Sequence, residues 1–273
     1  MVGDVKVFKK FPFFNRLKKR INLIDINTPG IEKVKFGYGS ELAGKASLGY
    51  LNKSLEIMKE YGLKRLVTAP LSKESVKLVL PGFCGHTEYL ASYFNKAEVV
   101  MLMVSGKLKV AMLTRHIPLR EVSSFVSEKA IVSLLSIVYH FFKKQFKIKS
   151  PRIVMAAFNP HAGRETFLEK EENKMLRAME KFQRKVSGPY PADTVFVKDN
   201  LKKYDCVICT YHDQAMIPFK LLSMQNGVNV TLGLPVIRTS PAHGVAYDVM
   251  RRGKIPFHSS MVEAIRLALK LSV

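Results

Sequence analysis

The sequence predicts an α/β protein with a parallel or mixed sheet that is covered by helices on both faces. Short apolar runs rich in β-branched residues alternate along the chain with longer segments of helical spacing, and this alternation is typical of such sheets. The chain has 273 residues, of which 47% are hydrophobic. It can therefore bury a large core, in one domain or in two closely joined ones.

The predicted elements run from a basic opening to a C-terminal helix. Residues 1–34 are rich in lysine and arginine, and a turn is expected near Asn27–Gly30. Apolar side chains at helical spacing then predict a helix over 40–61. The remaining elements are expected as strands at 64–70, 97–104, 109–116, 152–158 and 204–210, a helix-rich region at 123–146, and helices at 168–185 and 260–271.

No apolar stretch reaches the roughly 18 residues that a membrane-spanning helix needs. The longest, residues 130–142, contains Ser133, Ser136 and His140 and predicts a buried helix. Charged residues shortly after Met1 argue against a signal peptide. We therefore expect a cytoplasmic protein that does not associate with membranes.

The chain is strongly basic, with 44 Lys and Arg against 22 Asp and Glu and a net charge of +22. Such a charge favours anionic partners, among them phosphorylated substrates, nucleotides, nucleic acid and membrane surfaces. A solvated surface rich in lysine explains the same composition. Charge alone does not choose between these alternatives.

Three cysteines argue against a disulfide framework, because their number is odd. Cys206 and Cys209 form a C-x-x-C, but residues three apart on a strand face opposite sides of the sheet. We interpret them as core thiols rather than as a zinc or redox site.

Three histidines carry the clearest chemical signal. His116, His161 and His212 each end a predicted strand, and ligands of parallel α/β sheets bind beyond the carboxyl ends of the strands. Three imidazoles that meet there can hold a catalytic divalent metal with one open position. Asp213 can orient His212 or act as a further ligand. Alternatively, each histidine is a loop residue satisfied by hydrogen bonds.

A second group of candidates favours anion binding. His86 and Thr87 stand at the predicted start of a helix, where Thr87 can cap the helix and an anion can bind. Downstream, Lys220, Asn229 and Arg238 can clamp a phosphate. The alternatives are a simple helix cap for Thr87 and solvated surface positions for the two cations.

Three further features complete the candidate site. Two glycines within 227–235 permit sharp turns or close backbone approach. His243 is a further candidate for a pocket residue. Asp193 follows a proline-rich turn and can serve as a general base, as a carboxylate near the metal, or as a helix cap.

These segments, in this order, resemble the 4-hydroxythreonine-4-phosphate dehydrogenase (PdxA) family of pyridoxal phosphate biosynthesis. The resemblance covers about residues 36–271. The matching segments are 85–91 (GHTEYLA), 114–120 (TRHIPLR), 159–163 (NPHAG), 188–194 (GPYPADT), 211–214 (YHDQ) and 227–240 (GVNVTLGLPVIRTS).

The resemblance implies a fold like that of isocitrate and isopropylmalate dehydrogenases, with two α/β subdomains around a cleft. On this basis residues 1–34 are a divergent basic segment and 35–273 the catalytic region. The implied roles are metal binding by His116, His161 and His212, substrate binding by His86, Thr87, Lys220, Asn229 and Arg238, and catalysis by Asp193 and His212.

The resemblance also implies the reaction and its partners. The expected enzyme is an oxidoreductase that uses NAD or NADP and a divalent metal (Zn, Mg or Co). It would oxidise 4-hydroxythreonine 4-phosphate, which then loses its carboxylate. A homodimer is expected, with the site at the subunit interface. The chain lacks a G-x-G-x-x-G motif, and the family binds its nucleotide without one.

Two alternatives stay open. The substrate can be a related phosphorylated sugar acid. The chain can also be a non-catalytic homologue that binds a polyanion through the Arg16–Arg20 cluster. We do not expect nucleic-acid binding, because the sequence shows neither an RNA-binding motif nor an aromatic platform.

Overall fold

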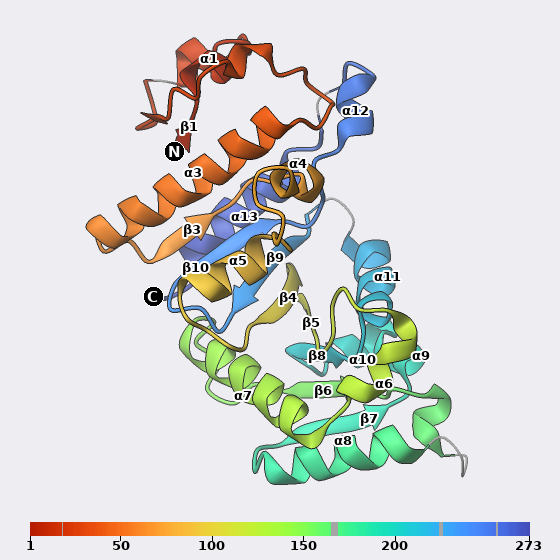
Figure 1. The fold of residues 1–273 in the computed structure, drawn as a ribbon. Helices are drawn as coiled ribbons and strands as arrows, with labels where there is room; N and C mark the ends of the chain where they lie inside the picture. Colours follow the sequence, from red (N-terminus) through yellow and green to blue (C-terminus); the bar gives the residue numbers. More distant parts are fainter. Residues whose placement is uncertain (18, 165–168, 224–225, 255) are drawn as a thin grey trace.

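The computed structural model of the chain describes residues 1–17, 19–164, 169–223, 226–254 and 256–273. In these residues one eight-stranded sheet has the order β3-β10-β9-β4-β5-β8-β6-β7, and β1 and β2 form a separate pair. Figure 1 shows the N-terminal segment at one end of the molecule and β7 with α8 at the other. The strands are β1 (Val2–Gly3), β2 (Ile24–Asp25), β3 (Arg65–Val67), β4 (Val100–Ser105), β5 (Leu108–Met112), β6 (Ile153–Ala156), β7 (Val186–Tyr190), β8 (Cys206–Cys209), β9 (Val228–Leu232) and β10 (Ile237–Pro241).

Four of the seven pairings in the large sheet are parallel. The other three are antiparallel and involve β10 with β9, β9 with β4, and β4 with β5. The predicted α/β class with a mixed, mostly parallel sheet is therefore confirmed. Strands β5, β8 and β6 lie side by side and point the same way, so their carboxyl ends meet at one edge of the sheet.

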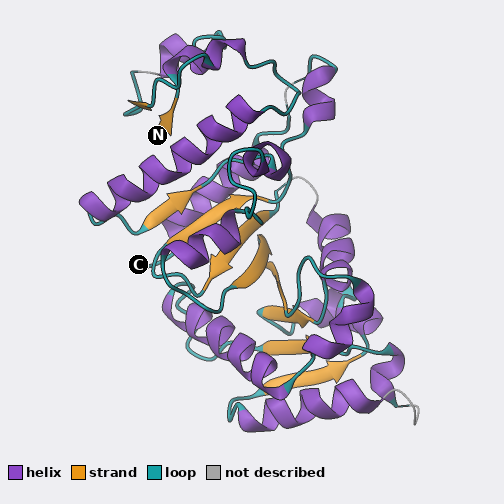
Figure 2. Ribbon diagram, viewed as in Figure 1, coloured by secondary structure: helices purple, strands orange, loops and turns teal. Residues whose placement is uncertain are grey.

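Helices cover both faces of the sheet (Figure 2). One apolar cluster joins α7, α8 and α13 to one face, while α11 packs on the other face. A third cluster joins α3 and α5 to β3. The helices are α1 (Val5–Phe8), α2 (Phe14–Leu17), α3 (Glu41–Glu60), α4 (Lys73–Lys77), α5 (His86–Tyr93), α6 (Val122–Phe125), α7 (Glu128–Lys144), α8 (Glu169–Lys181), α9 (Ala192–Val195), α10 (Lys198–Leu201), α11 (His212–Ser223), α12 (Tyr247–Arg251) and α13 (Ser259–Lys270).

The long predicted helices are present where their apolar spacing places them. Helix α3 starts after Ser40, whose hydroxyl accepts a hydrogen bond from the backbone of Ala43 at 3.1 Å, as an N-cap does. Helix α7 is a buried core helix, as predicted, and starts after Ser127 in the same way. The predictions for Leu168 and for Lys18 of the basic cluster lie outside the described residues.

The N-terminal segment is attached to α3 by one buried carboxylate. Asp4 is 1% exposed; it accepts hydrogen bonds from the Tyr50 hydroxyl at 2.6 Å and from the Thr28 backbone at 2.7 Å. Burial alone would raise the pKa of Asp4, but these hydrogen bonds outweigh it and lower the pKa. Hydrogen bonds to the buried Asp4 carboxylate therefore help to hold the N-terminal segment against α3, rather than apolar packing alone.

Two smaller predictions can be compared with the structure. Cys206 and Cys209 are free and buried, which confirms them as core thiols. No single helix in the described part of the chain is long and apolar enough to cross a membrane; residues 119–125 and α7 meet that test only as a pair bent by 87°.

Candidate functional site

A pocket of about 190 Å³ lies over β9 and β10, beside the starts of α4 and α5. We call it the Arg238 pocket. This volume is below the roughly 300–1,000 Å³ of pockets for drug-sized ligands, so it suits a small metabolite. Its polar lining consists of Lys73, His86, Thr87, Glu88, Arg115, His116, Asn229, Arg238, Ser240 and His243.

The strand register explains why three of these residues, Asn229, Arg238 and Ser240, share the pocket. Side chains two apart on a strand face the same side, and Arg238 and Ser240 of β10 lie opposite Thr231 and Asn229 of β9. All four side chains therefore point to one face of the sheet. The glycines of 227–235 suggested turns, but most of this stretch is strand β9, which is followed by a turn at Gly233 with φ 91°.

Arg238 is the central cation of this pocket. The residue is 2% exposed, and its guanidinium donates to the hydroxyls of Thr68, at 2.7 Å from Nη2, and Thr231, at 3.1 Å from Nη1. Burial lowers its pKa to about 10. Among the described residues it forms no ion pair within 4.0 Å. A buried charge without a counter-ion is costly, so this position favours an anionic ligand.

Asn229 adds a second unsatisfied group. Its side-chain Oδ1 is buried and has no hydrogen-bond partner among the residues that the structure describes. Buried polar groups are nearly always bonded, and the amide can present either its oxygen or its NH2 group by a half-turn. Together, Asn229 and Arg238 form a built cradle for a polar, negatively charged ligand.

His86 and Thr87 close the pocket from α5. The helix starts at His86, its N-cap is Gly85, and no side chain caps it; the expectation that Thr87 caps the helix is therefore wrong, because Thr87 already lies within the first turn. Burial, then the charges of Arg238 and Lys73, lower the pKa of His86 to about 3. Its imidazole is neutral near pH 7 and stands in a strongly positive field.

Two of the three strand-end histidines are neighbours. The rings of His116 and His212 lie 5.7 Å apart, centroid to centroid. Burial, Lys73 and His212 lower the pKa of His116, which favours the neutral imidazole that a metal requires. Asp213 Oδ1 lies 2.7 Å from His212 Nδ1, so the carboxylate orients this ring and leaves Nε2 for another partner.

His161 and Asp193 line a separate pocket of about 270 Å³, together with Asn159, Tyr211 and Gln214. None of the residues that line this His161 pocket also lines the Arg238 pocket. Within the described residues no three histidine, cysteine or acidic side chains form a metal-binding group. One chain thus offers two adjacent imidazoles for a metal, and the third candidate ligand lies elsewhere.

Lys220 also lies apart from the other expected phosphate ligands. It is an exposed residue of α11, eight positions after His212, or about 12 Å along the helix axis. It is not among the residues that line the Arg238 pocket. His243, in contrast, does line that pocket.

Three charged residues of the pocket were missed in the sequence: Lys73, Glu88 and Arg115. Glu88 and Arg115 stand next to residues that were singled out, Thr87 and His116. Lys73 follows the predicted strand 64–70 by three positions. The strand-end argument applied to the histidines would have found it.

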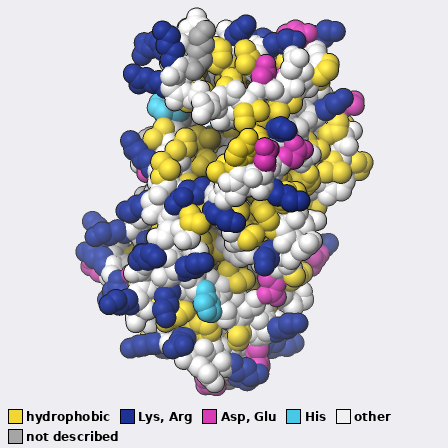
Figure 3. Space-filling view, turned by 90° about the vertical axis from the view of Figure 1, so that its left-hand side faces the viewer, with side chains coloured by type: hydrophobic (Ala, Val, Ile, Leu, Met, Phe, Trp, Pro, Cys, Tyr) yellow, Lys and Arg dark blue, Asp and Glu magenta, His cyan; other side chains and the backbone are white. Residues whose placement is uncertain are grey.

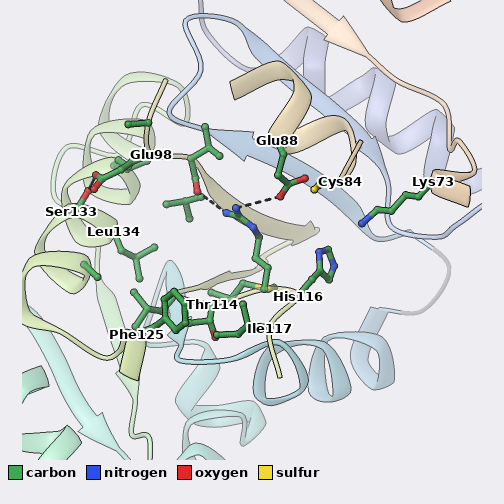
Figure 4. Close-up of a pocket in the computed structure, with 18 residues that line it drawn as sticks. Lys73, Cys84, Glu88, Glu98, Thr114, His116, Ile117, Phe125, Ser133 and Leu134 are labelled. Carbon is green, nitrogen blue, oxygen red and sulfur yellow. Dashed lines mark hydrogen bonds and ion pairs between the residues drawn. The ribbon is translucent and has the colours of Figure 1, made fainter. Parts of the chain in front are cut away.

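Two larger cavities share walls with the Arg238 pocket. One, of about 650 Å³, shares Lys73, Glu88, Arg115 and His116 and continues past Phe125 (Figure 4). The other, of about 590 Å³, lies beneath the N-terminal segment and shares 69–71 and His86.

A mixed α/β sheet with strand-end imidazoles beside a buried anion cradle defines an α/β enzyme of small, negatively charged metabolites. Residues 5–268 match the model of the family described as pyridoxal phosphate biosynthetic protein PdxA. The chain therefore belongs to the PdxA family, as the resemblance implied.

Named relatives agree with this assignment. The 4-hydroxythreonine-4-phosphate dehydrogenase of Desulforapulum autotrophicum is 39% identical over 236 residues, which cover 85% of this chain and 69% of the relative. The enzyme of the same name from Sulfurihydrogenibium sp. is 37% identical over 255 residues, or 92% of this chain and 76% of the relative.

Solved structures show the same fold. The 4-hydroxythreonine-4-phosphate dehydrogenase of Klebsiella pneumoniae is 34% identical with a TM-score of 0.79, covering 91% of this chain and 78% of that one. The enzyme of the same name from Burkholderia phymatum is 30% identical with a TM-score of 0.76, covering 100% and 88%.

Removal of the buried charge should separate binding from stability. In Arg238→Met we expect the affinity for inorganic phosphate to fall about 100-fold, because charge-assisted hydrogen bonds are lost. The free energy of unfolding should stay equal or rise, because an unpaired buried charge is removed. Calorimetric titration and urea unfolding measure the two effects, with the exposed Arg266→Met as control. Unchanged phosphate affinity would contradict the assignment.

The pKa of His86 makes stability depend on pH. It is about 3 in the folded protein and near 6.5 in the unfolded chain, so between these values only the unfolded chain binds the proton. The stabilisation is therefore complete above about pH 6.5 and declines as the pH falls towards 3. Relative to His86→Gln, wild type should lose unfolding free energy between about pH 7 and about pH 5 in urea titrations. A difference that does not change with pH would refute this.

Proposed function

We propose that this chain oxidises 4-hydroxythreonine 4-phosphate with NAD or NADP and a divalent metal, and that the product then loses its carboxylate, in pyridoxal phosphate biosynthesis. Family membership supports the reaction. The observation that carries the substrate class is the buried Arg238 without a counter-ion, beside the unsatisfied amide of Asn229. Together they suit a phosphate that is removed from water.

In this proposal Arg238 and Asn229 bind the phosphate, and His86 and Thr87 contact the substrate from α5. The neutral His86 donates or accepts a hydrogen bond without adding charge. Oxidation moves a hydride from the alcohol carbon to the nicotinamide and releases the hydroxyl proton. The ketone formed lies β to the carboxylate, which leaves as carbon dioxide. Asp193 is the proposed base for the hydroxyl proton.

His116 and His212 are the residues that fit a divalent metal, because their rings are adjacent and Asp213 orients the second. When bound, a metal such as Zn, Mg or Co lowers the pKa of the substrate hydroxyl and polarises the ketone. His161 is the proposed third ligand. The nicotinamide nucleotide is proposed to enter through one of the two cavities that adjoin the Arg238 pocket.

We also propose a homodimer with the site at its interface. Helix α11 starts at His212 and exposes three apolar side chains, Ile217 at 60%, Leu221 at 80% and Leu222 at 56%. An exposed apolar patch beside a divided site suits a second copy of the chain. In one chain, His161, Asp193 and Lys220 lie outside the Arg238 pocket. In the proposed dimer, the second copy of the chain would bring these residues to the site.

Activity and metal content test the reaction. Purified protein with divalent metal, 4-hydroxythreonine 4-phosphate and NAD or NADP should reduce the nucleotide, and a chelator should abolish the reaction. His116→Ala should lose most of its bound metal and activity, whereas His140→Ala, an exposed histidine of α7, should retain both. Activity that persists without metal would refute the metal-dependent mechanism. If the protein oxidised a different phosphorylated sugar acid but not 4-hydroxythreonine 4-phosphate, the reaction type would stand and only the proposed substrate would be wrong.

The interface is tested on α11. Leu221→Asp places a charge on the exposed apolar face and should convert a dimer into monomers, with activity lost through the divided site. Sedimentation or light scattering measures the mass, and Leu269→Asp, on the exposed part of α13, is the control. A wild-type protein that is monomeric and active would overturn the interface.

The charge of the chain supports a second candidate, polyanion binding. In Figure 3 lysine and arginine side chains spread over the whole face, while acidic ones are few. Arg16, Lys19 and Arg20 of the basic cluster are exposed. Gel retardation at increasing salt tests it: tight binding that is steeply lost with salt, in a protein that retains no metal, would favour this function over the dehydrogenase.

A further inference from the structure

The Arg238 pocket contains a second cation without a carboxylate partner. Lys73 lines this pocket, and among the described residues its Nζ forms no ion pair within 4.0 Å. Figure 4 shows its side chain extending from the start of α4 towards the space between Glu88 and His116. The pocket therefore has two cations, Lys73 and Arg238, that form no ion pair within 4.0 Å among the described residues.

Local structure places Lys73 there. It is the first residue of α4, directly after the N-cap Ser72, whose hydroxyl accepts from the Ser75 backbone at 3.1 Å. Its stem crosses Gly85, where an added Cβ would lie 3.1 Å from Lys73 Cε, 3.2 Å from Glu88 Oε2 and 3.4 Å from Lys73 Nζ. Gly85 also has φ +145°, a conformation that suits glycine. The glycine before His86 thus gives the lysine its path into the pocket.

The remaining pocket cation, Arg115, is already neutralised. Its Nη2 lies 3.5 Å from Glu88 Oε1, and its Nη1 donates to the Val99 carbonyl at 2.7 Å. Glu88 is the one carboxylate in the pocket lining. Arg238 and Lys73 form no such ion pair within 4.0 Å among the described residues, although the charge of Glu88 also raises the pKa of Arg238. Both cations can act on the ligand, and both, after burial, lower the pKa of His86.

We propose that Lys73 binds a second anionic group of the substrate, its carboxylate, while Arg238 holds the phosphate. The inference rests on the proposed function, because it takes the substrate class to be a phosphate ester that also carries a carboxylate. In such a substrate the reacting hydroxyl lies between the two anions. Lys73 points towards His116 (Figure 4), which is a candidate metal ligand for that hydroxyl.

The two cations differ in a way that suits this division. Arg238 is buried on the strands and offers a planar fork, the geometry that phosphate recognition favours. Lys73 is an exposed residue of a helix start, and its flexible ammonium suits a carboxylate that arrives from the open side. Lys73 would thus make the pocket prefer phosphorylated acids over simple phosphate esters.

Binding of two simple esters tests the inference without turnover. O-phospho-L-serine carries both a phosphate and a carboxylate, whereas phosphoethanolamine lacks the carboxylate. Wild type should bind phosphoserine more tightly in calorimetric titrations. Lys73→Met should weaken phosphoserine binding about tenfold, the loss of one charge-assisted bond, and leave phosphoethanolamine and inorganic phosphate unchanged. Lys77→Met, at the other end of α4 and also exposed, is the matched control.

Two results would overturn the inference. If Lys73→Met weakened the binding of both esters equally, Lys73 would bind the phosphate. If it changed the binding of neither, Lys73 would have no role in ligand binding. Lys73→Arg keeps the charge and should preserve the preference; if Lys73→Met does not fold, loss of the preference in Lys73→Gln but not in Lys73→Arg decides the question.

The outcome is distinguishable from failure of the proposed function. With 4-hydroxythreonine 4-phosphate, Lys73→Met should raise KM about tenfold and change kcat less, since one binding contact is lost. A protein that prefers phosphoserine through Lys73 but does not oxidise this substrate would refute the function and keep the inference. An active enzyme whose KM is unchanged by Lys73→Met would support the proposed function and refute the inference.

Discussion

A buried guanidinium without a counter-ion is the constraint on which the rest of the site depends. Arg238 can stay charged on the sheet only because Thr68 and Thr231 supply oxygens from two neighbouring strands. These hydroxyls orient the charge but do not neutralise it. Burial, together with this positive charge, keeps His86 neutral, and the charge favours an anionic ligand. Asn229 Oδ1, on the neighbouring strand, has no hydrogen-bond partner among the described residues. The pocket is therefore organised before any substrate arrives, at a cost in desolvation that the ligand offsets.

The sheet decides how the remaining candidates are distributed. Strands β5, β8 and β6 are adjacent and parallel, so their following loops leave the same edge. His116 and His212, after neighbouring strands, come close together. His161 follows the next strand, within a turn where it adopts φ 54°, and lines a different pocket. Strand β6 is as near to β8 as β5 is, so strand order does not account for this separation, which arises in the turn that follows β6.

Much of the fold could be predicted from local patterns. Helices α3 and α7 and strands β4, β5, β6 and β8 lie where apolar periodicity put them, because burial on one face imposes that spacing. Strands β9 and β10 were not predicted, since two glycines and two prolines within 227–241 suggest turns. The helix cap expected of Thr87 was wrong because the helix already begins at His86, with Gly85 as its N-cap, so Thr87 lies within the first turn. Such local choices depend on neighbours that the sequence does not show.

The sequence by itself determined which functional groups are available: imidazoles at strand ends, an amide and a guanidinium further along the chain, and a net positive charge that favours anionic ligands. Only the tertiary structure decided which of them share a space. It brought Lys73, His86 and Arg238, distant in the chain, into one pocket, and it placed Lys220 and Asp193 outside that pocket. The reason is physical. Residue type sets what a side chain can bind, whereas strand register and helix packing set which charges surround it. The spatial distances between residues far apart in the sequence do not follow from any local pattern.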